Sequence, residues 1–334
     1  MHVLITGADG FVGAALVRRL LQGPPTGAGQ GGVVQGGAGQ GDIRLTLVDR
    51  HFRQGPPGAR HRHYTGSFAD PALLQHLSDD PPQQVFHLAS MPGALAEREP
   101  EAGIQANLLA TVQLLEHLAG LTRQGRQGRT SPPRVVLASS VAVYGALGPE
   151  PVTEQQLPQP ELSYGAHKWM SELLLADFSR RGELDGCSLR LPGIVARPAT
   201  ESGHGSAFMS QIFHALREGR PYECPVSPEA SAWWMSLACC LDNLLHAASL
   251  SASTMPASRC WQLPVLCLPV ASVIEATAQH LGRPAAALIQ HRPDSRIEAL
   301  FGRQPPLLTP LAEAAGFVHD GSVQGLVARV LAAM

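Results

Sequence analysis

Residues 2–13 read HVLITGADGFVG, and this stretch decides the fold. The run HVLIT is typical of a short buried strand, and it ends at Gly7. Gly10 and Gly13 follow at intervals of three, and residues 11–22 then have the apolar spacing of a helix. In such a unit the first glycine allows a tight turn, the second a close approach of the backbone to a pyrophosphate, and the third close packing of the helix on the strand. The stretch therefore predicts a strand, a turn and a helix that bind a dinucleotide.

The helix after the turn begins with Phe11 and Val12, so their backbone N–H groups would face the phosphates. Further along, strand and helix patterns alternate as far as residue 195. We predict strands at 2–6, 43–48, 62–65, 85–90, 134–140 and 187–192, and helices at 11–22, 70–78, 101–122 and 162–181. This alternation predicts an α/β fold with a doubly wound parallel Rossmann sheet. We expect a dinucleotide-binding domain at 1–195 and, in most of 196–334, a smaller C-terminal substrate-binding lobe.

Composition excludes several classes of protein. Charged residues make up only 16% of the 334 residues and the net charge is −2, which argues against a nucleic acid or anionic membrane partner. No apolar run approaches a membrane span, and the first residues lack the pattern of a signal peptide, so we expect a cytoplasmic protein. The six cysteines form no C-x-x-C pair, and we expect reduced thiols and no metal. Residues 23–41 contain nine glycines and predict a flexible surface insert.

Asp49 follows the second predicted strand, in the sequence LTLVDR. A carboxylate at this position can accept hydrogen bonds from the adenosine ribose hydroxyls and repels a 2′-phosphate. The low-complexity insert accounts for its long separation from Gly7. Asp49 therefore favours NAD as the cofactor, although Arg50 beside it leaves NADP open.

The sequence contains a single lysine, Lys168, and every other basic residue apart from histidine is arginine. Tyr164 lies four residues before it, which places both side chains on one face of the predicted helix. A nearby ammonium favours the phenolate and lowers the pKa of the tyrosine. The pair therefore indicates a general base that takes a proton from a hydroxyl group.

Ser139 and Ser140 end the fifth predicted strand, in SSVAVYG. Ligands of parallel sheets bind at the carboxyl ends of the strands, so a hydroxyl here can donate a hydrogen bond to a substrate oxygen. Either serine could instead cap a turn.

With these motifs the chain resembles an extended short-chain dehydrogenase/reductase of the NAD-dependent epimerase/dehydratase family. Within that family, SSVAVYG, the helix around Tyr164, LRLPGIVARP, WWMS and LLTPLAEAAGF are most similar to the D-erythronate dehydrogenases. The resemblance implies that Ser140 is the catalytic hydroxyl, Tyr164 the base, and Lys168 its partner, which also binds the nicotinamide ribose. It implies further cofactor contacts at Ser67, Leu88, Ala89, Ser90, Asn107, Pro192 and Val195.

The resemblance implies NAD-dependent oxidation of a secondary hydroxyl on a small sugar acid, with D-erythronate to 2-keto-D-erythronate as first choice. We expect Arg197 and Ser206 to bind the substrate carboxylate, and Ser90 and Ser140 to contact the substrate. Val141 and Ala142 stand where dehydratases carry two acids, which excludes water elimination. Two alternatives stay open: a nucleotide-sugar 4-epimerase with tightly bound NAD, and a non-catalytic dinucleotide sensor. Family behaviour suggests a homodimer through the helices at 101–122 and 162–181.

Overall fold

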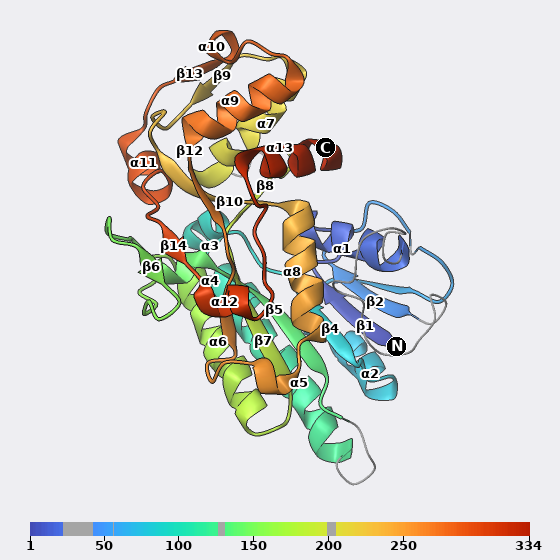
Figure 1. Cartoon of the computed structure of the whole chain (residues 1–334). Helices are drawn as coiled ribbons and strands as arrows, with labels where there is room; N and C mark the ends of the chain where they lie inside the picture. Colours follow the sequence, from blue (N-terminus) through green and yellow to red (C-terminus); the bar gives the residue numbers. More distant parts are fainter. Residues whose placement is uncertain (23–42, 56, 126–130, 199–204) are drawn as a thin grey trace. The chain divides into compact units, whose positions relative to one another are not determined.

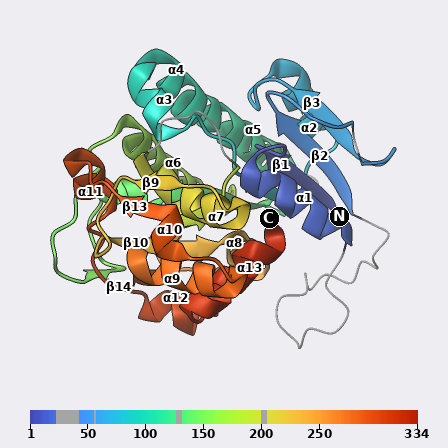
Figure 2. The same cartoon turned by 90° about the horizontal axis from the view of Figure 1, so that it is seen from above.

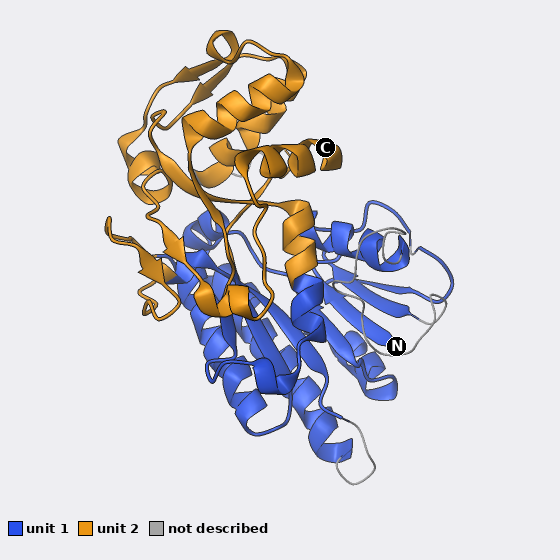
Figure 3. Cartoon of the chain, in the orientation of Figure 1, with its two compact units in different colours: residues 1–143, 162–190, 244–261 blue, residues 144–161, 191–243, 262–334 orange. Residues whose placement is uncertain are grey.

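The computed structural model describes residues 1–22, 43–55, 57–125, 131–198 and 205–334 (Figure 1). The glycine-rich insert predicted at 23–41 lies outside these ranges. The backbone forms two compact units (Figure 3): unit 1 contains residues 1–143, 162–190 and 244–261, and unit 2 contains residues 144–161, 191–243 and 262–334. The division expected from the sequence has one boundary after residue 195, whereas these units interleave. The reason is strand pairing, since β11 joins the sheet of unit 1 and β6 pairs with β14 in unit 2.

The centre of unit 1 is a seven-stranded sheet with the order β11-β7-β5-β4-β1-β2-β3. Its strands are β1 (His2–Thr6), β2 (Arg44–Asp49), β3 (Arg62–Thr65), β4 (Gln84–His87), β5 (Arg134–Ser140), β7 (Asp185–Leu191) and β11 (Cys260–Gln262). The pairs from β3 through β1 and β4 to β5 are parallel. Chain order reverses beside β1, which makes the edge where β1 and β4 end the switch point at which such sheets bind ligands. The predicted doubly wound Rossmann fold is confirmed.

Helices cover both faces of this sheet. Leu4 of β1 packs in a cluster with α2 (Pro71–Asp79), α5 (Ala110–Gly125) and α6 (Ser163–Arg180). Its neighbours Val3 and Ile5 are fully buried and point to the opposite face, because side chains alternate along a strand. That face is covered by α1 (Phe11–Gln22) (Figure 2). The run Val3, Leu4 and Ile5 is therefore apolar at every position, as expected for a strand of a parallel sheet that is covered on both faces.

The helix predicted at 101–122 is interrupted. The structure has α4 (Pro100–Ile104), one π-helical turn (Gln105–Leu109) and then α5. Asn107, inside the π turn, is buried and bonds the backbone of Met91 in both directions. Single π turns are frequent at functional sites because they redirect one side chain. A short helix that the sequence analysis missed, α3 (Gly93–Arg98), lies between β4 and α4.

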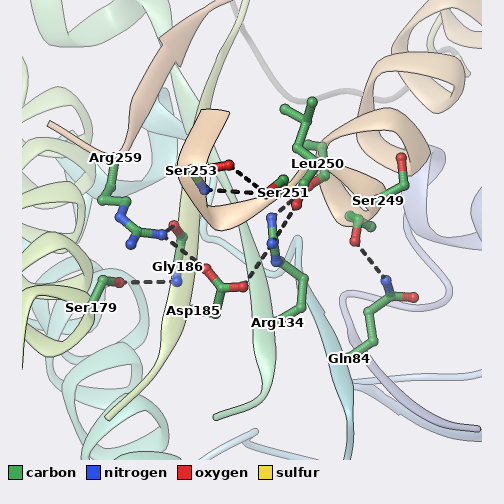
Figure 4. Close-up of polar contacts among 12 residues, drawn as sticks. Gln84, Arg134, Ser179, Asp185, Gly186, Ser249, Leu250, Ser251, Ser253 and Arg259 are labelled. Atoms are coloured by element: carbon green, nitrogen blue, oxygen red, sulfur yellow. Dashed lines mark hydrogen bonds and ion pairs between the residues drawn. The ribbon is translucent and has the colours of Figure 1, made fainter. Parts of the chain in front are cut away.

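The end of α8 (Leu237–Ser249) is attached to the sheet through Arg134 (Figure 4). Arg134 begins β5 and donates to the carbonyl oxygens of Ala247, at 3.1 Å, and Leu250. The same guanidinium pairs with Asp185 at 2.7 Å, and Arg259 pairs with the other oxygen of that carboxylate at 2.9 Å. A cation is well placed here because the last carbonyl groups of a helix have no partner within the helix.

Unit 2 has its own apolar core, around α7 (Phe208–Glu218), α9 (Val270–Leu281) and α13 (Val323–Ala333). These helices pack with a three-stranded sheet of the order β12-β10-β8. Strand β10 (Ser231–Ser236) was not predicted, because Trp233, Trp234 and Met235 are all buried and the sequence shows no alternation.

The remaining strands are β6 (Val152–Thr153), β8 (Gly193–Val195), β9 (Tyr222–Cys224), β12 (Leu266–Pro269), β13 (Ile289–His291) and β14 (Leu307–Leu308). The remaining helices are α10 (Ala285–Leu288), α11 (Ser295–Phe301) and α12 (Pro310–Ala314), with short 3-10 turns at Val141–Tyr144, Gly205–Ala207 and Ala252–Thr254. Within the described ranges, every helix is too short or too polar to cross a lipid bilayer.

Gly13 gives a direct test of the packing between α1 and β1. A Cβ atom at this position would lie 1.9 Å from the carbonyl oxygen of Gly7, so Gly13→Ala forces the backbone apart. We expect a loss of about 1–3 kcal/mol in the free energy of unfolding, the range for overpacking. Gly55→Ala is the matched control, because a Cβ there meets no atom within 4 Å. Equal urea midpoints for the two variants would contradict this account of the turn.

Candidate active site

The glycine turn brings three backbone segments of unit 1 together. Gly7 has a φ of 71°, a left-handed backbone conformation that is strained for residues with a side chain. The backbone N–H groups of Gly7 and Ala8 both donate to the carbonyl oxygen of Val48. A Cβ on Gly7 would also lie 2.8 Å from the backbone nitrogen of Ala89, after β4. The turn leads directly into Phe11 and Val12, the first residues of α1. A close backbone approach without side chains, at a helix N-terminus, fits the pyrophosphate of a dinucleotide.

Asp49 ends β2 and is fixed beside this turn. Its Oδ2 accepts from the backbone N–H of Asp9 at 2.8 Å, and its Oδ1 from the N–H of Arg50 at 2.7 Å. The Asp9 carboxylate pairs with Arg53 at 3.0 Å. Both carboxylates therefore lie at the end of β2 where the sequence predicts the adenosine ribose. The predicted contact at Ser67 lies after β3, where its hydroxyl accepts from the N–H of Ala69 and closes a turn.

The segment after β4 is held by buried hydrogen bonds. The N–H groups of Leu88 and Ala89 donate to Thr6, the first to its carbonyl oxygen and the second to its hydroxyl oxygen, at 3.2 and 3.3 Å. Asn107 fixes the following Met91 from the π turn. Ser90, between them, is exposed. The structure thus holds the predicted residues Leu88 to Ser90 next to the glycine turn, as a cofactor or substrate contact requires.

The two serines at the end of β5 differ in their surroundings. Ser139 is 2% exposed, and its hydroxyl donates to a carboxylate oxygen of Glu172. Ser140 is partly buried, and its oxygen accepts from the N–H of Ala142 at 3.1 Å. That bond uses a lone pair and not the hydroxyl proton, so Ser140 can still donate to a substrate oxygen. The structure therefore favours Ser140 over Ser139 as the substrate-facing hydroxyl.

Tyr164 and Lys168 lie one turn apart in α6, with the Lys168 Nζ 5.6 Å from the centre of the Tyr164 ring. Lys168 is 3% exposed, and its Nζ donates to the carbonyl oxygen of Ala138 in β5 at 2.7 Å. Burial lowers the pKa of Lys168 to about 8, although the negative charge of Glu172 opposes this shift. The ammonium is thus held next to the phenol ring, where it favours the phenolate.

Behind Lys168 lies a buried ion pair that the sequence analysis missed. Glu172 accepts from Arg190 through both of its oxygens, at 3.1 and 2.8 Å, and both side chains are buried. Glu172 is one further turn along α6 from Lys168, so the same four-residue spacing could have identified it. Arg190 lies in β7, and no local pattern in the sequence links it to Glu172.

His87, at the end of β4, is the second buried group that the sequence analysis missed. Its ring nitrogens bond the hydroxyl groups of Thr6 and Thr111 at 2.7 and 3.0 Å. Burial lowers the pKa of His87 to about 3, and the charge of Lys168 adds to the shift. His87 is therefore neutral at working pH, and it connects β1, β4 and α5 below the glycine turn.

The remaining predicted residues belong to unit 2. Pro192 comes directly before β8, and Val195 ends it. A guanidinium nitrogen of Arg197 donates to the Ser206 hydroxyl at 3.2 Å, and the backbone N–H of Arg197 donates to Ser210 at 3.0 Å. The structure therefore brings Arg197 and Ser206 together, as a carboxylate-binding pair requires. Their contact with a substrate, like all the predicted ligand contacts, stays a prediction.

The two serines make a matched test of this geometry. Ser139→Ala removes a buried hydrogen bond to a charged carboxylate, which we expect to cost about 1.5–3 kcal/mol of the free energy of unfolding. Ser140→Ala removes only a partly buried turn bond, so its loss should be smaller. Chemical denaturation of both variants and the parent chain measures the difference. A larger loss for Ser140→Ala would show that the two side chains have been placed the wrong way round.

Comparison with known proteins supports this fold and identifies the family of the chain. The chain is 36% identical to a D-erythronate dehydrogenase of Cupriavidus necator, covering 98% of this chain and 97% of the relative. It is 29% identical to a D-erythronate dehydrogenase of Haemophilus influenzae, covering 98% of both chains. A nucleoside-diphosphate-sugar epimerase structure from Agrobacterium tumefaciens matches with a TM-score of 0.85 at 30% identity, over 98% of this chain and 92% of that one. Residues 3–234 match the model of the NAD dependent epimerase/dehydratase family, and the chain belongs to that family.

Proposed function

We propose that this chain is an NAD-dependent dehydrogenase that oxidises a secondary hydroxyl of a small sugar acid, with D-erythronate to 2-keto-D-erythronate as first choice. The observation that supports this most is the buried Lys168 ammonium beside the Tyr164 ring. The full-length similarity to two relatives named D-erythronate dehydrogenase supports the substrate class.

In the proposed reaction the substrate alcohol loses a proton and a hydride and becomes a ketone. Tyr164 takes the proton on its phenolate oxygen as general base. Ser140 donates a hydrogen bond to the same substrate oxygen and holds it against Tyr164. Lys168 stabilises the phenolate through its charge, and its bond to Ala138 keeps the ammonium in place. Bound NAD supplies the chemistry that protein side chains lack, namely acceptance of the hydride.

The residues of unit 1 fit this cofactor. The tight turn at Gly7 and the close packing at Gly13 would present the N-terminus of α1 to the pyrophosphate, and Asp49 would accept from the ribose hydroxyls. The carboxylate of Asp49 repels a 2′-phosphate, so we expect NAD to be preferred over NADP. We further propose cofactor contacts from the residues that the family resemblance implies: Phe11, Val12, Ser67, Leu88, Ala89, Ser90, Asn107, Tyr164, Lys168, Pro192 and Val195.

A nucleotide-sugar 4-epimerase is the second candidate, because the Agrobacterium tumefaciens structure named as an epimerase is similar over nearly the whole chain. An epimerase would use the same base but would retain its NAD and show no net redox change. The stretch Ser231 to Trp234 offers no cation for a nucleotide diphosphate, which favours the dehydrogenase. Accumulation of NADH with a four-carbon sugar acid would separate the two activities.

Assembly and location are also proposals. We expect a homodimer through α5 and α6, since Leu109, Met170 and Leu173 are apolar side chains more than 40% exposed on or next to these helices. We also propose that the enzyme is cytoplasmic, as the sequence analysis predicts.

Tyr164→Phe tests the reaction most simply. Removal of the phenolic oxygen removes the proton acceptor but leaves the glycine turn and Asp49 intact. We expect turnover of D-erythronate to fall by about 10²–10⁴-fold, the usual contribution of a general base. Binding of NAD, measured by calorimetry, should be largely unchanged. A variant that keeps more than about a tenth of the parent rate would show that Tyr164 is not the base.

Arg197→Ala tests the substrate class. A sugar acid brings a carboxylate into the site, and an arginine can bind it through two parallel hydrogen bonds. We expect the variant to bind D-erythronate more weakly, by about 2–5 kcal/mol, because one charge loses its partner. Binding of NAD and of the uncharged analogue erythritol should be unaffected. Equal affinity of both proteins for D-erythronate would exclude Arg197 as the carboxylate ligand.

A further inference from the structure

Three potential metal ligands meet in unit 1 where β1 begins and α2 ends. They are His2, His76 and Asp80, and one ligand atom from each lies within 4.8 Å of the others. His2 is the first residue of β1, His76 lies in the last turn of α2, and Asp80 is the residue that ends this helix. More than seventy residues separate His2 from the other two, so no spacing pattern in the sequence indicates the group.

The end of α2 positions two of the three side chains. His76 and Asp80 are four residues apart, which places them on one face of the helix. The N–H of Asp80 donates to the carbonyl oxygen of His76 at 3.0 Å and fixes this spacing. Both side chains are partly exposed. The His76 ring stacks on Tyr64 and its Nε2 lies 3.5 Å from the Thr46 hydroxyl, which keeps it close to His2.

His2 is already oriented as a ligand. Its side chain is 1% exposed, and its Nε2 bonds the Thr46 hydroxyl at 2.8 Å. The other ring nitrogen, Nδ1, is buried next to the backbone of Pro81, forms no hydrogen bond of good geometry with the residues that the structure describes, and lies 3.7 Å from a carboxylate oxygen of Asp80. In metal sites one ring nitrogen of a histidine donates to a neighbouring group and the other binds the ion. Thr46 and Nδ1 of His2 match this arrangement.

Two carboxylates and one arginine set the charge around the three side chains. Asp79 and Asp80 stand at the C-terminal end of α2, where the helix dipole is negative and disfavours carboxylates. Arg44 pairs with both carboxylate oxygens of Asp80 at 2.7 Å, so a metal ion would bind in place of this guanidinium.

We propose that His2, His76 and Asp80 bind a divalent transition-metal ion, zinc as first choice, which fastens the end of α2 to the start of β1. Two imidazoles and one carboxylate are a common zinc donor set, with the fourth position left to water. At bond lengths of about 2.0–2.1 Å, tetrahedral ligand atoms lie roughly 3.3 Å apart. The Nδ1 of His2 and the oxygen of Asp80 already approach this separation, and rotation of His76 would complete the site.

Zinc binding to the full, tag-free chain tests the proposal. The protein is first stripped with a chelator, and Zn²⁺ is then titrated by calorimetry while the melting temperature is followed. We expect one equivalent to bind and to raise the melting temperature, because the ion binds only the folded state. His76→Ala and Asp80→Asn should each weaken binding by about tenfold or more.

Three controls make the result decisive. His280→Ala removes an exposed histidine of α9 and should leave zinc binding unchanged. Arg44→Gln removes the competing cation beside Asp80 and should tighten binding. Melting of each variant without zinc checks that it still folds.

Absence of stoichiometric zinc binding by the parent chain would overturn the proposal. Undiminished binding by a folded His76→Ala variant would also overturn it, because the ion would then be held by the terminal amine and His2, or by cysteines. Neither result depends on turnover, so this test is separate from that of the proposed dehydrogenase activity.

Discussion

The hydrogen bond from the Lys168 ammonium to the carbonyl oxygen of Ala138 is the interaction on which the candidate site depends. It joins α6, which carries Tyr164, to β5, which ends at Ser140. An ammonium in this buried position is unfavourable unless it is paired and bonded. The structure meets this requirement with the Ala138 carbonyl and with the nearby charge of Glu172, which Arg190 and Ser139 hold in place. An arginine could not replace the lysine here, because its planar fork needs more room and more acceptors.

The same interaction accounts for the type of reaction but not for the choice of substrate. A phenol beside a buried ammonium provides a base for any secondary alcohol that reaches it, in a dehydrogenase or in an epimerase. The choice of substrate therefore depends on other residues, and the paired Arg197 and Ser206 of unit 2 are the ones we propose. Their chemistry suits a carboxylate, which D-erythronate has.

Much of the fold and site could be predicted from the sequence, because the signals are local. The glycines of residues 7–13, the spacing of Tyr164 and Lys168, and the alternation of strands and helices each depend on neighbours in the chain. The parts that were missed depend on distant contacts. The Glu172–Arg190 pair joins a helix to a strand, and the π turn occurs where Asn107 bonds Met91. The units interleave because β11 pairs with β7 and β6 pairs with β14. Strand β10 was missed because full burial removes the alternation that marks a strand.

Because the chain has a single lysine, the burial of the Lys168 ammonium beside Tyr164 can be measured directly. Growth with lysine labelled at Cε gives one side-chain NMR signal, which belongs to Lys168, and its chemical shift can be followed against pH. The account predicts a midpoint at about 8, because burial lowers the pKa of this ammonium. A midpoint near the ordinary lysine value of about 10.4 would contradict a buried ammonium beside Tyr164.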